Sequence, residues 1–221
     1  MSQHRAAGQG QYLLPRRRMA ERLAVANDGG RVRDALASVP RHLLIPDALR
    51  GEAYRDVALP IGDGQTISAP GIVAAMTAAL ELQGHETVLE IGTGSGYQAA
   101  ILGRLASRVV SIERLPSLAA RARTALDRLG VSNVVVYLGD GSLGRPADAP
   151  FDAILVTAGG PAVPTPLLEQ LAPEGRLVGP FGTHEEQRLV RVRRSRDGRF
   201  ASEVIGRCRF VDLIGTHGWG T

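Results

Sequence analysis

The sequence predicts an α/β protein built on a doubly wound, mainly parallel sheet. Three observations support this prediction. Between residues 88 and 180, short apolar runs alternate with helix-forming stretches, which is the pattern of successive strand–helix–strand units. A glycine turn, G-T-G-S-G, joins one of these runs directly to a helix-forming stretch. Near the end of the chain two runs are joined by R-D-G-R, a hairpin signal that predicts an antiparallel edge on the parallel sheet.

The chain begins with two predicted amphipathic helices. They span Arg16 to Ala26 and Arg31 to Val39, and Gly29-Gly30 separates them. Pro40 and Pro46 then bracket what we expect to be an extended link.

Residues 51–69 are predicted to be irregular, and a regular alternation follows them. Pro70 suits the first turn of a helix, which we expect to run to about Leu82. The alternating strands and helices after it are expected at Val88 to Ile91, Tyr97 to Ala106, Val109 to Ile112, Ser117 to Leu129, Val134 to Leu138, Ala153 to Thr157, Pro166 to Leu171 and Arg176 to Pro180. The strands of the final hairpin are expected at Arg188 to Ser195 and Phe200 to Val211.

The glycine turn indicates a nucleotide-like ligand. Gly92, Gly94 and Gly96 follow an apolar run that ends in Glu90-Ile91. Glycine is needed where the backbone takes positive φ or approaches a ligand closely, because a Cβ would clash there. Thr93 and Ser95 complete the turn, and we expect them to bind the same ligand as the glycines.

Two further acids follow later strands and suit an adenosine. Glu113 closes its strand about 20 residues after Gly92, where a carboxylate can accept both ribose hydroxyls. Asp140, in Gly139-Asp140-Gly141, follows the next strand and could accept an exocyclic amine. Considered alone, Glu113 would be interpreted as a solvated charge at a strand end, and Asp140 as a residue that favours a turn. Because both follow predicted strands, we favour the interpretation that they bind a ligand.

The spacing of the glycines favours S-adenosylmethionine over NAD. The turn reads G-x-G-x-G, not the G-x-G-x-x-G that brings a pyrophosphate onto a helix N-terminus. Glu90 just before the turn also predicts a negative pocket, which suits a sulfonium cation better than a diphosphate.

Composition fits a soluble enzyme. The chain has 221 residues, 44% of them hydrophobic, which is enough for one domain with a full core. Charged or polar residues interrupt every apolar stretch well short of ~18 residues, so we expect no membrane span. Met1 to Gln11 lacks the apolar core of a secretory signal, and we expect a cytoplasmic monomer. Cys208 alone excludes a disulfide within the chain, and no histidine spacing suggests a metal site.

All the basic residues are arginine, which we interpret as codon bias in a GC-rich genome. Nucleic acid is therefore not expected as a partner, although the arginines leave an RNA-binding methyltransferase as an alternative. An NAD-dependent oxidoreductase is a further alternative, which the glycine spacing disfavours.

Several motifs together resemble the protein-L-isoaspartate O-methyltransferase family. They are V-P-R-H-L from Val39, A-L-P-I-G from Ala58, G-Q-T-I-S-A-P from Gly64, E-I-G-T-G-S-G from Glu90, G-D-G from Gly139 and A-P-F-D-A-I from Ala149. The resemblance runs from about Arg16 to Val211, and G-Q-T-I-S-x-P is its most diagnostic part. It implies a class I methyltransferase fold, which is Rossmann-like.

The resemblance also implies an activity. Family members transfer a methyl group from S-adenosylmethionine to the α-carboxylate of L-isoaspartyl residues in damaged proteins and peptides, and the ester then closes to a succinimide. A sister activity, methylation of an ordinary aspartate in a ribosomally made peptide, differs only in the acceptor.

Residue roles follow from the same resemblance. Ser68 would hold the acceptor carboxylate with its hydroxyl; without the resemblance its first interpretation is a cap for the helix that Pro70 begins. The residues that map onto the family's cofactor positions are Gln65, Thr66, Ile67, Glu90, Gly92, Thr93, Gly94, Ser95, Gly96, Glu113, Asp140 and Gly141. We divide the single domain into N-terminal helices and substrate loop (1–69), cofactor-binding core (70–181) and C-terminal hairpin and tail (182–221).

Four positions depart from the family's usual residues. Members commonly carry an aromatic residue at Arg145, alanines at Gly159 and Gly160, and proline at Asp212. Gly159, Gly160 and Asp212 are expected near the peptide groove, so these departures bear on the choice of substrate. The sequence leaves open whether the tail from Gly215 to Thr221 forms a lid.

Overall fold

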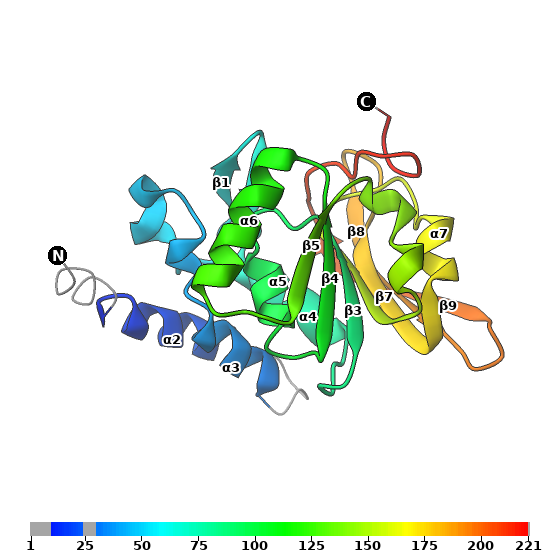
Figure 1. Ribbon diagram of the computed structural model, residues 1–221, viewed down its shortest axis with the longest axis horizontal. Helices are drawn as coiled ribbons and strands as arrows, with labels where there is room; N and C mark the ends of the chain where they lie inside the picture. Colours follow the sequence, from blue (N-terminus) through cyan, green and yellow to red (C-terminus); the bar gives the residue numbers. More distant parts are fainter. Residues whose placement is uncertain (1–9, 24–29, 221) are drawn as a thin grey trace.

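The computed structural model describes residues 10–23 and 30–220 of the chain and has a seven-stranded sheet at its centre (Figure 1). The strand order is β5-β4-β3-β6-β7-β8-β9. The strands are β3 (Thr87–Ile91), β4 (Arg108–Glu113), β5 (Val134–Leu138), β6 (Phe151–Val156), β7 (Leu171–Gly182), β8 (Gln187–Arg194) and β9 (Phe200–Cys208). The pairs from β5 to β7 are parallel, whereas β8 and β9 run antiparallel to their neighbours. The predicted parallel sheet with an antiparallel hairpin edge is confirmed.

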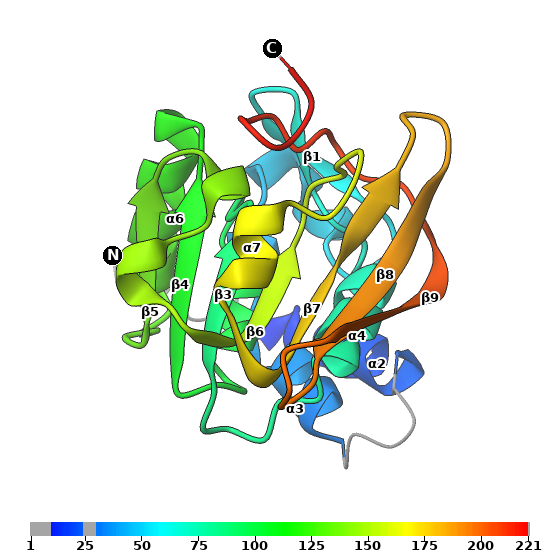
Figure 2. The same cartoon turned by 90° about the vertical axis from the view of Figure 1, so that its right-hand side faces the viewer.

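Helices cover both faces of this sheet (Figure 2). They are α2 (Leu13–Arg22), α3 (Arg31–Ser38), α4 (Pro70–Ala79), α5 (Tyr97–Leu102), α6 (Pro116–Arg128) and α7 (Thr165–Glu169), with short 3₁₀ helices η1 (Arg41–Leu43), η2 (Asp47–Glu52), η3 (Gly141–Leu143) and η4 (Pro146–Asp148). Helices α2 to α6 pack on one face, and α7 packs on the other.

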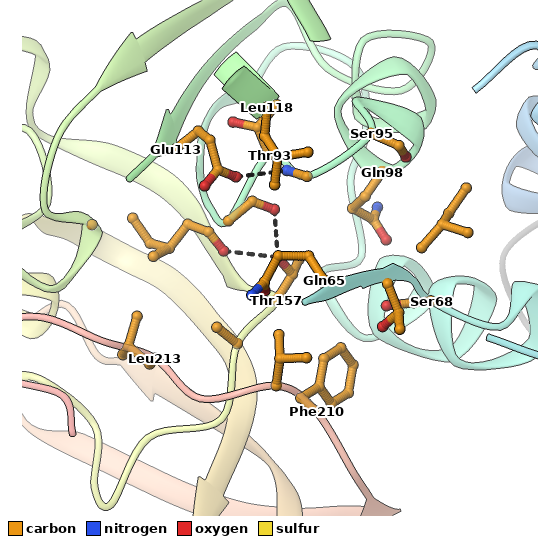
Figure 3. Close-up of a pocket in the computed structure, with 18 of the residues that line it drawn as sticks. Gln65, Ser68, Thr93, Ser95, Gln98, Glu113, Leu118, Thr157, Phe210 and Leu213 are labelled. Carbon is orange, nitrogen blue, oxygen red and sulfur yellow. Dashed lines mark hydrogen bonds between the residues drawn. The ribbon is translucent and has the colours of Figure 1, made fainter. Parts of the chain in front are cut away.

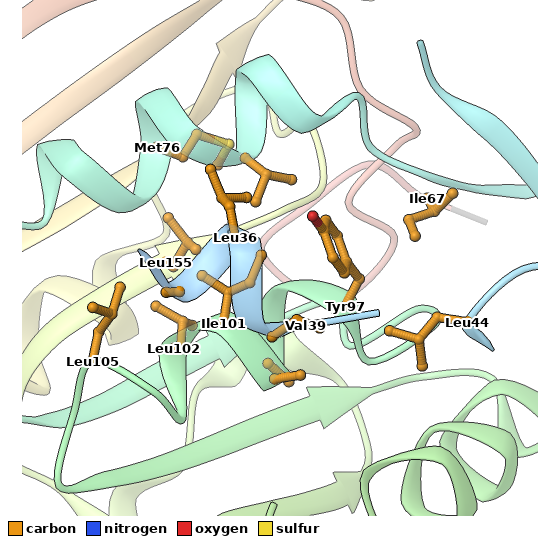
Figure 4. Packing of buried hydrophobic residues seen from close by; sticks show 14 of the residues in the cluster. Leu36, Val39, Leu44, Ile67, Met76, Tyr97, Ile101, Leu102, Leu105 and Leu155 are labelled. Atoms are coloured by element: carbon orange, nitrogen blue, oxygen red, sulfur yellow. The ribbon is translucent and has the colours of Figure 1, made fainter. Parts of the chain in front are cut away.

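The strands are apolar on both sides because both faces are covered. Along β3, Val88 contributes to the core under α2 to α6, while Leu89 and Ile91 contribute to the core under α7. Figure 4 shows the first of these cores, where Tyr97 and Ile101 of α5 pack among residues of α3 and α4. This packing fixes the start of α5, and with it the glycine turn, against the sheet.

The segment predicted to be irregular contains a hairpin. Strands β1 (Leu59–Gly62) and β2 (Gln65–Ile67) pair antiparallel, and Asp63 and Gly64 between them have φ of 55° and 69°. Two consecutive positive φ values are the signature of a tight type I′ hairpin turn, for which Asp-Gly is a preferred sequence. The signal was present in the sequence, and the prediction for residues 51–69 was wrong here.

The link between Pro40 and Pro46 was also predicted wrongly. It is not extended, because η1 occupies Arg41–Leu43 within it. The buried guanidinium of Arg41 organises this stretch from the inside, which no local pattern reveals.

Several helix ends differ from the prediction. Helix α2 starts three residues early, with Pro15 in its first turn, and the predicted end at Ala26 and the Gly29 breaker lie outside the described residues. Helix α4 ends at Ala79 instead of Leu82 because Glu81 adopts a φ of 50°. Helix α5 ends at Leu102 instead of Ala106, next to Gly103, where a Cβ would lie 3.0 Å from Val131 and Val134.

Strand β7 is much longer than predicted, and the strand before the tail is shorter. A helix was predicted to end at Leu171, but Leu171 pairs with Phe151 and already belongs to the sheet. Strand β9 ends at Cys208, and the chain beyond it crosses the edge of the sheet through bridges such as that between Asp212 and Gly159.

Within residues 10–23 and 30–220, no helix is both long and apolar enough to span a membrane. The same residues contain no group of three or more acidic, histidine or cysteine side chains placed to hold a metal ion.

Candidate active site

A pocket lies at the carboxyl edge of the sheet, where β3 and β6 lie side by side (Figure 3). The chain leaves β3 towards β4 on one side and returns through β6 on the other, so this is the point where the strand order reverses. Ligands of open α/β sheets bind at such switch points. The pocket is lined by Gln65, Thr66, Ile67, Ser68, Val73, Met76, Ile91, Gly92, Thr93, Gly94, Ser95, Tyr97, Gln98, Ile112, Glu113, Arg114, Leu118, Gly141, Thr157, Ala158, Phe210, Val211, Asp212, Leu213 and Ile214.

The glycine turn forms one wall of the pocket with bare backbone. Gly92, Gly94 and Gly96 have φ of 95°, 54° and 84°, the region that favours glycine. At Gly92 a Cβ would also lie 2.5 Å from Thr157 Oγ1, so glycine is required there twice over. Of the predicted turn residues, Gly92 to Ser95 line the pocket, while Gly96 serves as the left-handed residue before α5.

Glu113 lies at the end of β4 and faces the glycine turn. Its Oε2 accepts the Gly94 amide at 2.8 Å, and its Oε1 accepts the Leu115 amide at 3.0 Å. The side chain is 5% exposed and lines the pocket. A carboxylate oxygen has two lone pairs, so each oxygen can still accept a second hydrogen bond.

Glu90 lies behind the turn and does not line the pocket, so its part in cofactor binding stays a prediction. It is fully buried, and within the described residues its Oε1 has no partner. Its other oxygen accepts the Ser111 hydroxyl, which lies 2.5 Å from Thr93 Oγ1. Burial raises the pKa of Glu90 to about 8, and the nearby Glu113 charge adds to this rise. Burial therefore favours the protonated form of Glu90, which makes it a weak source of the negative charge expected of the pocket. The acids in the lining are Glu113 and Asp212.

Asp140 also lies outside the lining, although its neighbour Gly141 belongs to it. Its Oδ1 accepts the Ser142 amide and hydroxyl, and its Oδ2 accepts the amide and hydroxyl of Thr216 in the C-terminal tail. Burial alone would raise the pKa of Asp140, but these hydrogen bonds outweigh burial and hold the pKa below its ordinary value. Gly141 therefore lies at the pocket, whereas the Asp140 carboxylate is hydrogen-bonded to Ser142 and Thr216. Contact between Asp140 and an adenosine amine remains a prediction.

Ser68 lies at the opposite side of the pocket from Glu113 (Figure 3). The cap position of α4 is Ala69, whose side chain cannot cap, and the Gly71 amide of the first turn donates to Asp56 Oδ1, so the structure does not support the capping interpretation of Ser68. Within the described residues the Ser68 hydroxyl has no hydrogen-bond partner, whereas its carbonyl accepts Arg41 Nη2 at 3.0 Å. The backbone of Ser68 is fixed and its hydroxyl is free for a ligand. Gln65, Thr66 and Ile67 line the pocket beside it.

The tail closes another side of the pocket. Phe210 is held by Gln187, whose Oε1 accepts the Phe210 amide at 2.7 Å and whose Nε2 lies 3.2 Å from the Phe210 carbonyl. Beyond it, Leu213 N donates to Gly159 O at 2.7 Å, and Trp219 Nε1 donates to the same oxygen at 2.9 Å. The tail is thus bonded across the end of β6, not detached from it.

Three of the four unusual positions have a clear structural setting. Asp212 lines the pocket and lies 3.2 Å from His184, and Gly159 leaves the space that Gln187 fills, since a Cβ there would lie 2.3 Å from Gln187 Nε2. Arg145 lies away from the pocket, with its guanidinium 3.9 Å from the Tyr137 ring and ion-paired with Asp148.

Sequence reasoning missed Thr157, Gln98, Tyr97 and Phe210. Thr157 directly follows β6, and its hydroxyl lies 2.8 Å from Ile91 O and 2.6 Å from Gly92 O, which ties the glycine turn to the neighbouring strand. It could have been found, because the carboxyl ends of all parallel strands meet at one edge. Phe210 could not, because nothing local shows where the tail crosses the sheet.

Comparison with known families gives one match over most of the chain. The model of the protein-L-isoaspartate(D-aspartate) O-methyltransferase (PCMT) family matches residues 18–218. A protein-L-isoaspartate O-methyltransferase of Geobacter metallireducens is 52% identical over 210 residues, which cover 94% of this chain and 97% of the relative. Another, of Syntrophobacter fumaroxidans, is 58% identical over 189 residues, 86% of this chain and 88% of the relative.

Solved structures agree with these relatives. One protein-L-isoaspartate O-methyltransferase superposes with a TM-score of 0.82 at 28% identity, covering 92% of this chain and 67% of that one. A PCMT from Plasmodium falciparum, solved in complex with S-adenosyl-L-homocysteine, gives a TM-score of 0.77 at 21% identity over 90% of this chain and 98% of that one. Because the sequence identity to the Plasmodium falciparum protein is only 21%, this second comparison supports the fold alone.

Proposed function

Since the chain belongs to the protein-L-isoaspartate(D-aspartate) O-methyltransferase family and has its class I methyltransferase fold, we propose that it methylates the α-carboxylate of L-isoaspartyl residues in damaged proteins and peptides, with S-adenosylmethionine as its cofactor. The backbone amide nitrogen of the next residue then attacks the methyl ester and expels methanol, and the succinimide that forms begins repair. The observation that carries the proposal is that the free Ser68 hydroxyl and the Glu113 carboxylate line one pocket from opposite sides.

The residues present fit S-adenosylmethionine. The bare backbone from Gly92 to Ser95 leaves space that side chains would fill, and Glu113 keeps free lone pairs for ribose hydroxyls. Gly141 lines the pocket where an adenine would be expected, and Ile91, Ile112 and Leu118 make the wall apolar. When bound, S-adenosylmethionine supplies an activated methyl group.

The chain's own residues then have to place the acceptor. A carboxylate with a pKa near 4 is ionised at pH 7, so no general base is required. The Ser68 hydroxyl can donate a hydrogen bond to one carboxylate oxygen and leave the other free to attack in line. The residues that would shield the acceptor from water are Gln65, Thr66 and Ile67 of the hairpin and Phe210 to Ile214 of the tail, all of which line the pocket. Orientation of this kind can supply several kcal/mol of the barrier.

The test is tritiated methyl transfer to a matched pair of peptides that differ only in an isoaspartyl or an aspartyl linkage. We expect labelling of the isoaspartyl peptide alone, because the linkage displaces the carboxylate and in-line attack tolerates little displacement. Ser68→Ala should lower kcat strongly and leave S-adenosylhomocysteine affinity nearly unchanged, whereas Ser202→Ala, at an exposed serine of β9, should behave as wild type. Labelling of the aspartyl peptide would instead favour the sister activity on an ordinary aspartate.

We further propose a cytoplasmic monomer that binds no nucleic acid, and the division of the domain at residues 69 and 181. The assignment of the cofactor residues Gln65 to Ile67, Glu90, Gly92 to Gly96, Glu113, Asp140 and Gly141 is likewise a proposal. Its support is that most of these residues surround one pocket.

A further inference from the structure

Arg41 is a buried cation without an acidic partner. Its side chain is 0% exposed, and in the described part of the chain it forms no ion pair with a carboxylate. A buried charge is costly unless hydrogen bonds and an opposite charge compensate it. Arginine keeps its charge at any ordinary pH, so it cannot relieve the cost by losing a proton.

The hydrogen bonds of Arg41 all go to carbonyl oxygens. Nη1 donates to Ala53 O at 2.6 Å, and Nη2 lies 3.0 Å from both Val57 O and Ser68 O. Within the described residues its Nε is buried without a partner. The guanidinium therefore ties the stretch after η2 to the substrate loop. Carbonyl dipoles supply its hydrogen bonds, and the nearby Asp56 carboxylate acts on its charge without an ion pair.

Arg41 lies beside a residue of the pocket wall. Its guanidinium carbon lies 5.7 Å from the centre of the Tyr97 ring, and Tyr97 lines the pocket. The Tyr97 hydroxyl is buried in the apolar core, and within the described residues it has no hydrogen-bond partner. Arg41 itself is not part of the pocket lining, but its guanidinium donates to the Ser68 carbonyl, so an anion bound at the free Ser68 hydroxyl would lie in the field of this cation.

We propose that Arg41 is a positioning residue of the acceptor site, which holds Ser68 through its carbonyl and supplies the positive charge that the bound acceptor carboxylate neutralises. This inference rests on the proposed function. It assigns Arg41 a role in acceptor binding, beyond connecting two loops.

The first test compares wild type with Arg41→Lys. Lysine keeps the charge, but its single ammonium cannot reach the three carbonyls that the planar fork spans. We expect the KM for an isoaspartyl peptide to rise about tenfold or more while the Kd for S-adenosylhomocysteine stays within about twofold. In a Ser68→Ala background the same change should lower kcat/KM by a clearly smaller factor than in wild type, because the part of its effect that acts through the Ser68 hydroxyl is already lost.

Three results would overturn the inference. One is an unchanged KM in Arg41→Lys, and a second is an equal loss of peptide and S-adenosylhomocysteine affinity, which indicates general damage. The third is full additivity with Ser68→Ala. If wild type labels neither peptide, the proposed function fails and the inference falls with it; if wild type labels the isoaspartyl peptide, these results concern Arg41 alone.

A second variant tests the charge even if Arg41→Lys folds poorly. Asp56 acts on the Arg41 guanidinium electrostatically, and its Oδ1 accepts the Gly71 amide at 2.6 Å. Asp56→Asn keeps an acceptor for that amide and removes the opposing negative charge. We expect the KM for the isoaspartyl peptide to fall about two- to fivefold, with S-adenosylhomocysteine affinity unchanged. A KM that stays the same or rises would contradict the proposed role of the charge.

Discussion

Glu113 is held by the backbone that it faces, which sets how its replacement should act. The carboxylate accepts the Gly94 and Leu115 amides and lines the pocket. Glu113→Ala should weaken S-adenosylhomocysteine binding by about 1.5–3 kcal/mol, the range for hydrogen bonds to a charged group. Calorimetry measures this directly. Glu169→Gln, at an exposed acid on α7, is the matched control and should bind as wild type. Tight NAD binding without heat from S-adenosylhomocysteine would contradict the methyltransferase assignment.

The buried acid Glu90 should make stability fall as pH rises. Its folded pKa of about 8 exceeds the ordinary value of 4.5 for a glutamate side chain, so between these values the folded state binds a proton that the unfolded state does not. The stabilisation is therefore complete below about pH 4.5 and is lost progressively as pH rises towards 8. Glu90→Gln cannot ionise, so it should gain stability relative to wild type between pH 5.5 and pH 8.

Urea unfolding of wild type and Glu90→Gln at pH 5.5, 6.5 and 7.5 measures that difference. Acids whose pKa values are lowered, such as Glu81 and Glu86, contribute equally to the pH dependence of both proteins, so their contribution cancels in the difference. A constant difference across the three pH values would show that Glu90 is already ionised in the folded protein.

Site residues could be predicted from the sequence where their position depends on the residues next to them in the chain. Gly92, Gly94 and Glu113 follow from the glycine pattern and the strand ends, and they lie where expected. The state of Glu90 depends on full burial behind the turn, and the partner of Asp140 comes from Thr216, 76 residues away in the sequence. Neither fact has a local signature, so the sequence suggested a negative pocket and a free Asp140.

At the scale of elements, the β1–β2 hairpin carries the substrate loop and depends on its turn. Gly64 has a φ of 69°, and a Cβ there would meet no atom within 4 Å, so a side chain would be strained by backbone conformation alone. Gly64→Ala should cost about 1 kcal/mol of unfolding free energy.

Gly206→Ala is the matched control for this prediction. Gly206 lies in β9 without a positive φ and also has open space around its Cβ position. It should be neutral or slightly stabilising. Both variants can be measured by urea unfolding at one pH, and equal effects would mean that the turn is not strained by a side chain.

Element types were more predictable than element ends. Periodicity identified the parallel strands and the helices between them, because both sheet faces are covered and each strand is apolar throughout. The ends depend on tertiary contacts. Helix α5 ends where Gly103 packs against Val131 and Val134, and β7 begins early because Leu171 pairs with Phe151. These partners are distant in sequence, and a local pattern cannot place them.

At the scale of the whole molecule, the pocket is assembled from segments that span most of the chain. Ser68 follows the N-terminal hairpin, Glu113 ends β4, Thr157 follows β6 and Phe210 follows the last strand. The tail is then bonded back to Gly159 and Asp140. A ligand that contacts all these segments is linked to the folding of the entire domain, not of one part.

Binding of S-adenosylhomocysteine should therefore raise the melting temperature of the whole protein in a single transition. At a ligand concentration of about 100 times Kd, the added stability is about 2.7 kcal/mol. For a domain of this size that corresponds to a rise of about 5–10 °C. Differential scanning calorimetry measures both the shift and the number of transitions, and Glu113→Ala should reduce the shift at the same ligand concentration. Two transitions, of which only one moved with the ligand, would contradict a single cooperative domain and would place the cofactor site within one separately folding part.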